Sequence, residues 1–346
     1  MRMRFYLATV LAAGAGAAIL FGSHPAAAGE EGVTRLSIVS TASGDGELTH
    51  CGCKKKQLGG IFRRPTIIES ARSGADALLL VDAGNWAAID KFEPWEKTEF
   101  IWDLMGRLDY DAVTPGDSEL AWGRNDLLGL YSRHPEVQVV SANVTDKTGA
   151  LVWDEYRVVE RGGLRIAITG VTSAGTYGFN LTRGLQRSDD FDFLDSREAL
   201  RRLVPRLREE ADLVVVLMHE LPGDAERIVN EIPGMDVVVV GHNPGYAFNP
   251  DRIGNTLMVR AGNRGQYMSV LDLTLDAAKS VIDYTGEGKP LGKPVRDDPE
   301  MVAEVEAFVA AAAAREGEVQ KAEALRAASK QVEAVQAAEK GASEPR

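Results

Sequence analysis

The chain has 346 residues, of which 51 are acidic and 39 are basic, so its formal net charge is −12. This acidic balance argues against a partner with a phosphate backbone, and nucleic-acid binding is not expected. Only two cysteines occur, and both lie in one short run, so no disulfide framework joins distant segments. The fold must therefore be stabilised by a hydrophobic core.

The stretch 1–28 has the layout of a secretory signal peptide. Arg2 and Arg4 give a positive start, residues 5–21 are mainly apolar, and three alanines at the end form a cleavage site. An uncleaved membrane anchor is the alternative, because about 17 apolar residues lie at the lower limit for a bilayer span. We expect export to the periplasm or the extracellular space, followed by cleavage to a soluble mature protein.

Residues 29–294 alternate short β-branched runs with amphipathic stretches, which is typical of a layered α/β domain. The expected strands are 36–39, 77–82, 137–142, 164–170, 213–219 and 235–241. The expected helices are 63–73, 97–108, 196–210 and 223–232. Three later runs alternate as antiparallel strands do, and they predict a second sheet packed on the first. These runs are 256–261, 266–275 and 280–285.

The tail 295–346 changes to Ala, Glu, Lys, Gln and Arg. Its stretches 304–314 and 317–339 contain no proline and are rich in helix formers, so we expect it to be helical or partly disordered. The aliphatic positions become sparse toward the end, which favours a docked first helix followed by a loose, solvated arm. A longer coiled coil that binds a protein partner is the alternative.

Polar side chains follow several of the expected strands. They are Ser43, Asp45, Asn85, Asp117, Ser118, His219 and His242. In layered α/β proteins the strand ends open into loops that line one crevice, so we expect these side chains to converge.

This ordered series resembles the 5′-nucleotidase branch of the calcineurin-like metallophosphoesterases. The likeness covers residues from about 35 to 290, and its matching stretches are 58–64, 110–113, 140–144, 168–172 and 261–267. The sequence is similar in particular to the UshA-like (seleno)protein group, which carries Cys-Gly-Cys or a selenocysteine equivalent in the loop after the first strand. The resemblance implies a four-layer α/β/β/α sandwich, here with a C-terminal helical tail.

In that family an Asp-x-His, a bridging Asp, a Gly-Asn-His-Glu motif and later His residues hold two metals that activate water and clamp phosphate. Several of these positions carry another residue here. The replacements are Ser43 for the first Asp, Asp45 for its His, Asn85 for the bridging Asp, Asp117 for the Asn, Ser118 for the catalytic His and Pro244 for the last His. One of the two metal sites would keep only Asp45 and the amide of Asn85, and we expect it to be empty.

The other implied metal site keeps His219 and His242, while Asp117 and Asn85 have exchanged carboxylate and amide; Asp45 is a further candidate ligand. Two imidazoles and one carboxylate suit a single zinc, manganese or iron ion with an open position. The alternative is a crevice without metal, in which both imidazoles are satisfied by backbone hydrogen bonds. No nucleotide cofactor is expected, and no haem, because the chain has no Cys-x-x-Cys-His run.

Cys51 and Cys53 offer a different chemistry. A disulfide between them would close a small, strained ring, so it would be more easily reduced than a structural disulfide. The following run 54–56 is three lysines, whose positive charge favours the thiolate. We interpret the pair as a catalytic redox site with a thiol redox partner. The alternatives are soft-metal binding together with His50, supplied by a metal-donor partner, and a passive pair of thiols.

The loss of metal ligands and the gain of two cysteines in one region favour an exported, divergent 5′-nucleotidase-like metallophosphoesterase. In this reading hydrolysis is lost or weakened, and Cys51 and Cys53 do redox or metal-handling work. The alternatives are an active mononuclear metal-dependent phosphoester hydrolase and a non-enzymatic protein that binds a ligand or partner. The tail has neither the length nor the composition of the family's separate nucleotide-recognition domain, so the resemblance implies no nucleotide specificity.

Overall fold

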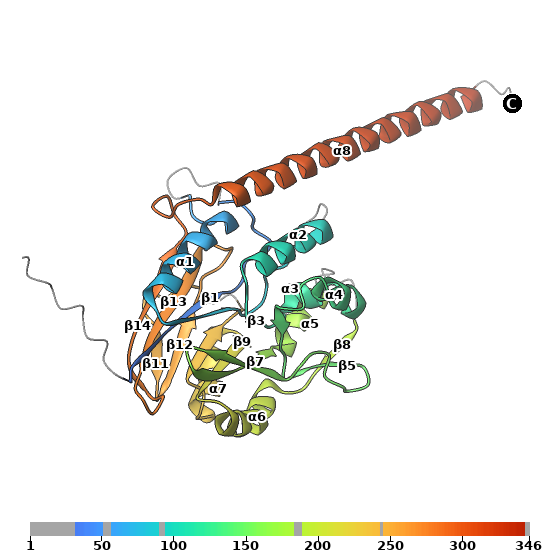
Figure 1. Ribbon diagram of the computed structural model, residues 1–346. Coiled ribbons are helices and arrows are strands. Elements are labelled where there is room, and N and C mark those ends of the chain that lie inside the picture. The colour runs from blue at the N-terminus through green and yellow to red at the C-terminus, as the bar shows by residue number, and fades with distance from the viewer. Residues whose placement is uncertain (1–31, 51–56, 90–93, 183–188, 243–244, 343–346) are drawn as a thin grey trace, which may run out of the picture.

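The computed structural model describes residues 32–50, 57–89, 94–182, 189–242 and 245–342. Two six-stranded sheets lie against each other, and helices cover the outer face of each (Figure 1). This is the mixed α/β sandwich that the sequence predicts. The expected signal peptide at residues 1–28 lies outside the described ranges.

The first sheet combines strands from the beginning and the end of the domain. Its order is β14-β13-β1-β2-β3-β4, in which the neighbours from β1 to β4 are parallel and β13 and β14 are antiparallel. The bounds are β1 Thr34–Thr41, β2 Ala77–Asp82, β3 Ala112–Val113, β4 Gln138–Val139, β13 Tyr267–Leu275 and β14 Val281–Pro290.

The second sheet has the order β11-β12-β10-β9-β7-β6, with parallel pairing from β12 to β7 and an antiparallel strand at each edge. The bounds are β6 Tyr156–Arg161, β7 Leu164–Thr172, β9 Leu213–His219, β10 Val237–Val240, β11 Asp251–Ile253 and β12 Thr256–Arg260. A separate antiparallel pair consists of β5 Val144–Asp146 and β8 Phe191–Phe193.

The expected grouping of the last three strand runs is wrong. Strand β12 joins the second sheet parallel to β10, whereas β13 and β14 cross to the edge of the first sheet beside β1. The first four residues of β12 are buried, which is typical of a strand covered on both faces. An alternating pattern shows which face of a strand is apolar, but it does not show which strand is the neighbour.

The helices account for most of the outer layers. Their bounds are α1 Arg64–Gly74, α2 Pro94–Arg107, α3 Asp117–Leu120, α4 Arg124–Tyr131, α5 Ala174–Thr182, α6 Ser196–Glu210, α7 Pro222–Glu231 and α8 Pro299–Ala342, and a 3₁₀ turn covers Ile61–Arg63. Helix α6 begins where Asp195 Oδ1 accepts from Glu198 N at 2.9 Å, a side-chain cap that satisfies one of the free amides of the first turn.

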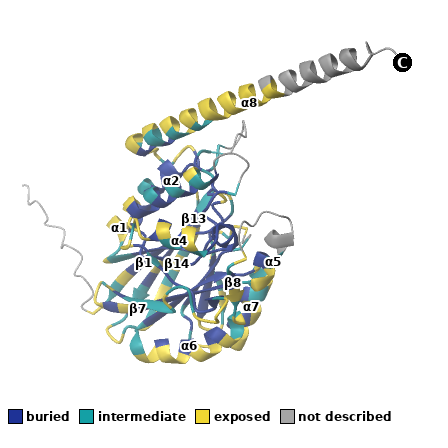
Figure 2. Ribbon diagram, turned by 90° about the vertical axis from the view of Figure 1, so that its right-hand side faces the viewer, coloured by how far each residue is buried: buried dark blue, intermediate teal, exposed yellow. Residues whose placement is uncertain are grey.

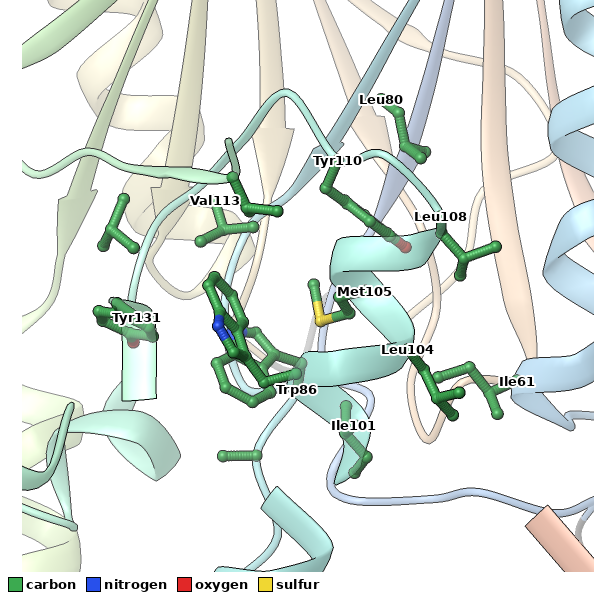
Figure 3. Packing of buried hydrophobic residues seen from close by; sticks show 14 of the residues in the cluster. Ile61, Leu80, Trp86, Ile101, Leu104, Met105, Leu108, Tyr110, Val113 and Tyr131 are labelled. Carbon is green, nitrogen blue, oxygen red and sulfur yellow. The ribbon is translucent and has the colours of Figure 1, made fainter. Parts of the chain in front are cut away.

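Three separate apolar clusters fill the spaces between the layers. Strand β9 shows the division, because Val214 and Val216 pack toward α6 and α7 while Val215 and Leu217 face the first sheet. On the far side of the first sheet, Leu80 belongs to a cluster that also contains α2 (Figure 3). The charged faces of α6 turn outward (Figure 2). Burial of apolar area in these three clusters is the main stabilising term for a chain without a disulfide framework.

Helix α8 joins the two helical stretches expected in the tail into one helix. Its first turns dock on the domain, where Val305 is fully buried and Phe308 stacks on Phe100 with ring centroids 4.5 Å apart. The described side chains farther along are mostly exposed (Figure 2). Gly317 does not interrupt the helix, since one glycine costs only about 1 kcal/mol there. Among the described residues, no helix is both long enough and apolar enough to cross a membrane.

We expect Val305→Ala to lower the free energy of unfolding by roughly 2 kcal/mol, because it removes two buried methyl groups and leaves a cavity under the helix. Val309→Ala is the matched control, one turn farther on the same helix, where the side chain is 41% exposed. The control should change stability by less than about 0.5 kcal/mol. Urea unfolding of both variants measures the difference, and equal values would show that α8 does not dock through Val305.

Candidate metal centre

The site lies where strands of both sheets end. His219 is the last residue of β9, and His242 follows the end of β10. From the first sheet, Asn85 follows β2, and Asp117 opens α3 after β3. Parallel strands of the two sheets thus end at the same side of the sandwich, where ligands bind in open α/β sheets.

Three side chains bring their donor atoms together. Asp117 Oδ1 lies 2.8 Å from His219 Nε2 and 3.0 Å from His242 Nδ1, and the two ring nitrogens are 3.2 Å apart. All three donor atoms lie within 4.8 Å of one another. Atoms that each stand about 2.1 Å from one metal are at most about 4.2 Å apart, so the separations fit a shared zinc-like ion. The donor set is one carboxylate and two imidazoles.

The backbone fixes the ring of His219. Its Nδ1 lies 2.8 Å from Ala83 O, so the N–H at this nitrogen donates and Nε2 is left to face Asp117. Such a hydrogen bond from the second ring nitrogen sets the tautomer of most metal-binding histidines. Three glycines enclose the same ring: added Cβ atoms would lie 2.8, 2.7 and 2.8 Å from it at Gly84, Gly116 and Gly241. Any larger residue at these positions would displace the imidazole.

Charge and hydrogen bonding act together in this triad. Burial alone would raise the pKa of Asp117, but hydrogen bonds from His219 and His242 and their positive charge hold it far below its usual value. Burial alone would lower the pKa of His219, but the bond to Asp117 and its negative charge raise it. The carboxylate is therefore ionised throughout the physiological range, in the form that binds a cation.

Asn85 braces the triad in this structure. Its Nδ2 donates to Asp117 Oδ1 at 3.0 Å, and its Oδ1 accepts from Ser118 N at 2.9 Å. The amide oxygen, which is the group that could bind a metal, is thus engaged with the backbone. Asn85 also has a φ of 60°, in the left-handed region where Asn is tolerated better than most residues.

Glu119 is a buried brace that the sequence did not single out. Its carboxylate is fully buried and accepts from Asn85 N at 2.8 Å, Ala87 N at 2.6 Å and Gly116 N at 2.7 Å. Burial raises the pKa of Glu119, while these amides oppose the shift. The available sequence signal is the spacing from Gly116, because a Glu at the third position of a helix often reaches back to the residue before it.

The loop after β1 supplies the other half of the crevice. Ser43 and Asp45 have φ values of 44° and 51°, a strained conformation for residues with side chains. Ser43 Oγ donates to Gly241 O at 2.6 Å, which ties this loop to the end of β10. Asp45 does not belong to the group of donors within 4.8 Å. Asp45 is exposed as a residue, yet protein around its carboxyl group removes part of the hydration of the charged form. This desolvation and the negative charges of Asp117 and Glu119 raise the pKa of Asp45 to about 7.

The remaining sequence candidates lie in different places. Ser118 is buried, and its hydroxyl donates to Glu119 Oε1 at 3.0 Å. Pro244, Cys51 and Cys53 lie outside the described residues, so the structure gives no position for them. His50, which directly precedes the cysteine segment, forms an isolated antiparallel bridge with Gly59.

Comparisons with known proteins agree with this fold. No protein-family model matches the chain. A 5′-nucleotidase from the venom of the snake Naja atra is 25% identical over 273 residues, which cover 71% of this chain and 50% of the relative. A 5′-nucleotidase of Vibrio cholerae is 24% identical over 252 residues, which cover 62% of this chain and 44% of the relative. The chain thus spans about half the length of the curated relatives it matches.

Solved structures show the same architecture. The 5′-nucleotidase precursor of Thermus thermophilus superposes with a TM-score of 0.69 at 24% identity, over 80% of this chain and 59% of that one. The calcineurin-like phosphoesterase YfkN of Bacillus subtilis gives 0.66 at 19% identity, over 79% of this chain and 96% of that one. The chain is thus similar in sequence to 5′-nucleotidases, and it shares the fold of these solved structures.

Proposed function

We propose that this protein is a divergent phosphoester hydrolase that works with one divalent metal. The observation that carries the proposal is the convergence of Asp117, His219 and His242, whose donor atoms lie 2.8 to 3.2 Å apart. The hydrogen bond from His219 to Ala83 O and the enclosing glycines hold this imidazole in an orientation that suits metal binding. A zinc, manganese or iron ion held there would polarise a phosphoryl oxygen and activate water.

The rest of the family's dinuclear centre is degraded in this proposal. Asn85 and Ser118 stand at the bridging and catalytic positions, and both are engaged in holding Asp117 and Glu119 in place. Loss of a general acid or base typically lowers a rate by about 10² to 10⁴. The Asp45 carboxyl has a pKa of about 7, so it can give or take a proton near neutral pH at this rim. We therefore expect slow turnover.

Hydrolysis by the mature protein tests this proposal. We expect slow cleavage of simple phosphate monoesters or diesters that requires added zinc, manganese or iron, and that falls at least about 100-fold in Asp117→Asn and His242→Ala. The control His134→Ala removes an imidazole that bonds to Asp103 and Glu136 instead, and it should keep full activity. Turnover that is absent with every metal, or that survives both site variants, would contradict a one-metal hydrolase.

A second candidate function is redox or metal-handling work by Cys51 and Cys53, the Cys-Gly-Cys run that resembles the loop of the UshA-like (seleno)protein group. Its support is the position of the described residues on either side of the cysteines. His50 pairs with Gly59, whose Cβ position would lie 3.5 Å from Gly265 O. The neighbouring Arg264 donates its N–H to Ser43 O at 2.6 Å. His50 and Gly59, which lie on either side of the cysteines in the sequence, are thus held near the loop that borders the candidate metal centre. A thiol redox partner or a metal donor would have to reach the cysteines themselves.

Export and the tail complete the proposal. We propose that residues 1–28 are a cleaved signal peptide and that the protein acts in the periplasm or outside the cell. The mass of the protein recovered from an expressing bacterium's periplasm would show a start at residue 29, and an uncleaved chain would contradict this. The exposed part of α8 would be the surface for a protein partner, since its first turns dock on the domain and the described side chains beyond them are mostly exposed.

A further inference from the structure

Three aromatic side chains form an ordered group, which we call the aromatic platform: Tyr246, Phe248 and Tyr267. The rings of Tyr246 and Tyr267 are stacked 4.2 Å apart at 8°, and Phe248 stands edge-on to Tyr246 at 5.1 Å and 88°. Phe248 is 61% exposed and Tyr246 is 44% exposed. Single exposed hydrophobic residues are common on protein surfaces, but an exposed ring fixed by two others requires an explanation.

The register of the second sheet places Tyr246 near the metal centre. Val240 pairs with Arg260 in parallel, so Ala261 lies level with Gly241, the residue before His242. Tyr246 forms an isolated antiparallel bridge with Ala261. Two strand spacings, roughly 10 Å in total, therefore separate the backbone beside His242 from the backbone of Tyr246.

The register of the first sheet brings Tyr267 to the same rim. Ser269 pairs with Ser40 in antiparallel register, so Tyr267 lies level with Ala42, the residue before Ser43. The ring of Tyr267 also packs over Gly262, where an added Cβ would lie 2.8 Å from Cδ2. The stacked tyrosines thus connect the rims of the two sheets on the side where the metal centre lies.

The loop that carries Phe248 is held against β14. Gly288 N donates to Phe248 O at 3.1 Å. Added Cβ atoms would lie 2.5 Å from Ala247 O at Gly288 and 2.6 Å from Pro250 Cδ at Gly286. Glycine inside a strand is destabilising, and it often marks the close approach of another backbone. Strand β14 carries glycine at two positions in spite of this cost, and the loop of Phe248 packs closely on both. The exposed ring therefore belongs to a loop that β14 holds in place.

The size and place of the platform favour a small planar ligand. Three side chains are too small a surface for a stable protein interface, which needs about 800 Å² on each partner. An aromatic ring, in contrast, stacks well on a single exposed Phe. A phosphoryl group at the metal centre and a ring on the platform could belong to one molecule, since the two lie on the same rim.

We propose that the aromatic platform binds a planar ring in the alcohol part of the ester and thereby sets substrate preference. This inference rests on the proposed hydrolase function, because it needs the phosphoryl group to bind at Asp117, His219 and His242. Phe248 supplies the open ring face, while Tyr246 and Tyr267 position it. The substrate class is therefore a phosphate ester with an aromatic ring several bonds away from phosphorus.

The test measures binding of two non-hydrolysable probes to the zinc-loaded full chain by titration calorimetry. The probes are 3-phenylpropylphosphonate and propylphosphonate, which differ only by the ring. We expect the ring to tighten binding by about 3- to 10-fold in the wild type. Phe248→Ala should bring the two affinities within about 2-fold, Phe248→Trp should keep the preference, and the control Ile282→Ala should not change it. Ile282 is also exposed, at 57%, but belongs to the opposite end of β14.

Each outcome distinguishes the platform from the metal centre. Equal affinity of the two probes in the wild type, or a ring preference that survives Phe248→Ala, would overturn the platform and leave the hydrolase proposal intact. Failure of both probes to bind the zinc-loaded protein would contradict the hydrolase proposal, and the platform with it.

Discussion

His219→Ala and His242→Ala are each expected to remove bound metal and, with it, the stabilisation that metal gives to the fold. The centre has three side-chain donors, so each single variant keeps only one imidazole and one carboxylate, which is fewer than the three protein ligands of a typical catalytic zinc site. At a free metal concentration of about 100 times Kd, binding stabilises a protein by roughly 2.7 kcal/mol. For a domain of this size, that corresponds to about 5–10 °C in Tm.

Metal content of the purified mature protein and the Tm with and without a chelator measure this effect. His219→Ala also opens a cavity between three glycines, so the metal-induced change in Tm is the relevant quantity, not the Tm itself. His242→Ala gives a second measurement of the metal-induced change in Tm. Its side chain is 24% exposed, so its loss disturbs the core less than the loss of His219. His134→Ala, a substitution away from the site, should retain the metal.

The same measurement separates the two proposed chemistries. Metal that is lost with the histidines and kept in Cys51→Ser/Cys53→Ser supports the hydrolase centre. Metal that is lost with the cysteines and kept without the histidines would instead indicate metal handling by the cysteine segment. A wild-type protein that binds no zinc, manganese or iron would refute the metal centre and leave a thiol redox role as the candidate.

Glu119→Gln is expected to lower the free energy of unfolding by about 1–3 kcal/mol, the cost typical of leaving a buried hydrogen-bond donor without an acceptor. Both carboxylate oxygens accept hydrogen bonds, and the four donors are three backbone amides and the Ser118 hydroxyl. A glutamine would turn an NH₂ group toward some of these donors and leave them without an acceptor. Metal affinity should also fall by about 10- to 100-fold, because Glu119 holds the loops of Asn85 and Asp117.

Urea unfolding of the metal-free protein measures the first effect, and metal titration measures the second. Glu209→Gln on α6 is the matched control, since this side chain is exposed, and it should shift stability by less than about 0.5 kcal/mol. If Glu119→Gln were as stable as this control, the carboxylate would not be the brace that its contacts suggest.

Much of the layered fold could be predicted because strands buried on both faces have a strong signal. The expected strands at 77–82 and 213–219 match β2 and β9. The partners of β12 and β13 could not be predicted, because pairing depends on contacts far along the chain. The direction in which the Asn85 amide points could not be predicted either, since it depends on Ser118 N and Asp117 together.

Residues outside periodic elements were the hardest to find. Tyr246 and Phe248 lie in a loop, where an aromatic residue has no pattern that separates packing from exposure. Gly286 and Gly288 were the available signal, because glycines in a strand pattern indicate a close approach of another segment. Trp86, which directly follows Asn85, is buried in the core (Figure 3) and stacks on Trp102 with ring centroids 5.2 Å apart.

The hydrogen bonds at the metal centre run from one sheet to the other. His219 joins Ala83 and Asp117 across the interface, and Ser43 joins Gly241 in the opposite sense. The two sheets cannot separate at this end without breaking all of these bonds. Opening of the crevice should therefore coincide with global unfolding. The backbone N–H of Asn85 should then exchange its hydrogen as slowly as the backbone N–H groups of the most protected core strands. The side chains of the candidate metal centre therefore also hold the two sheets together.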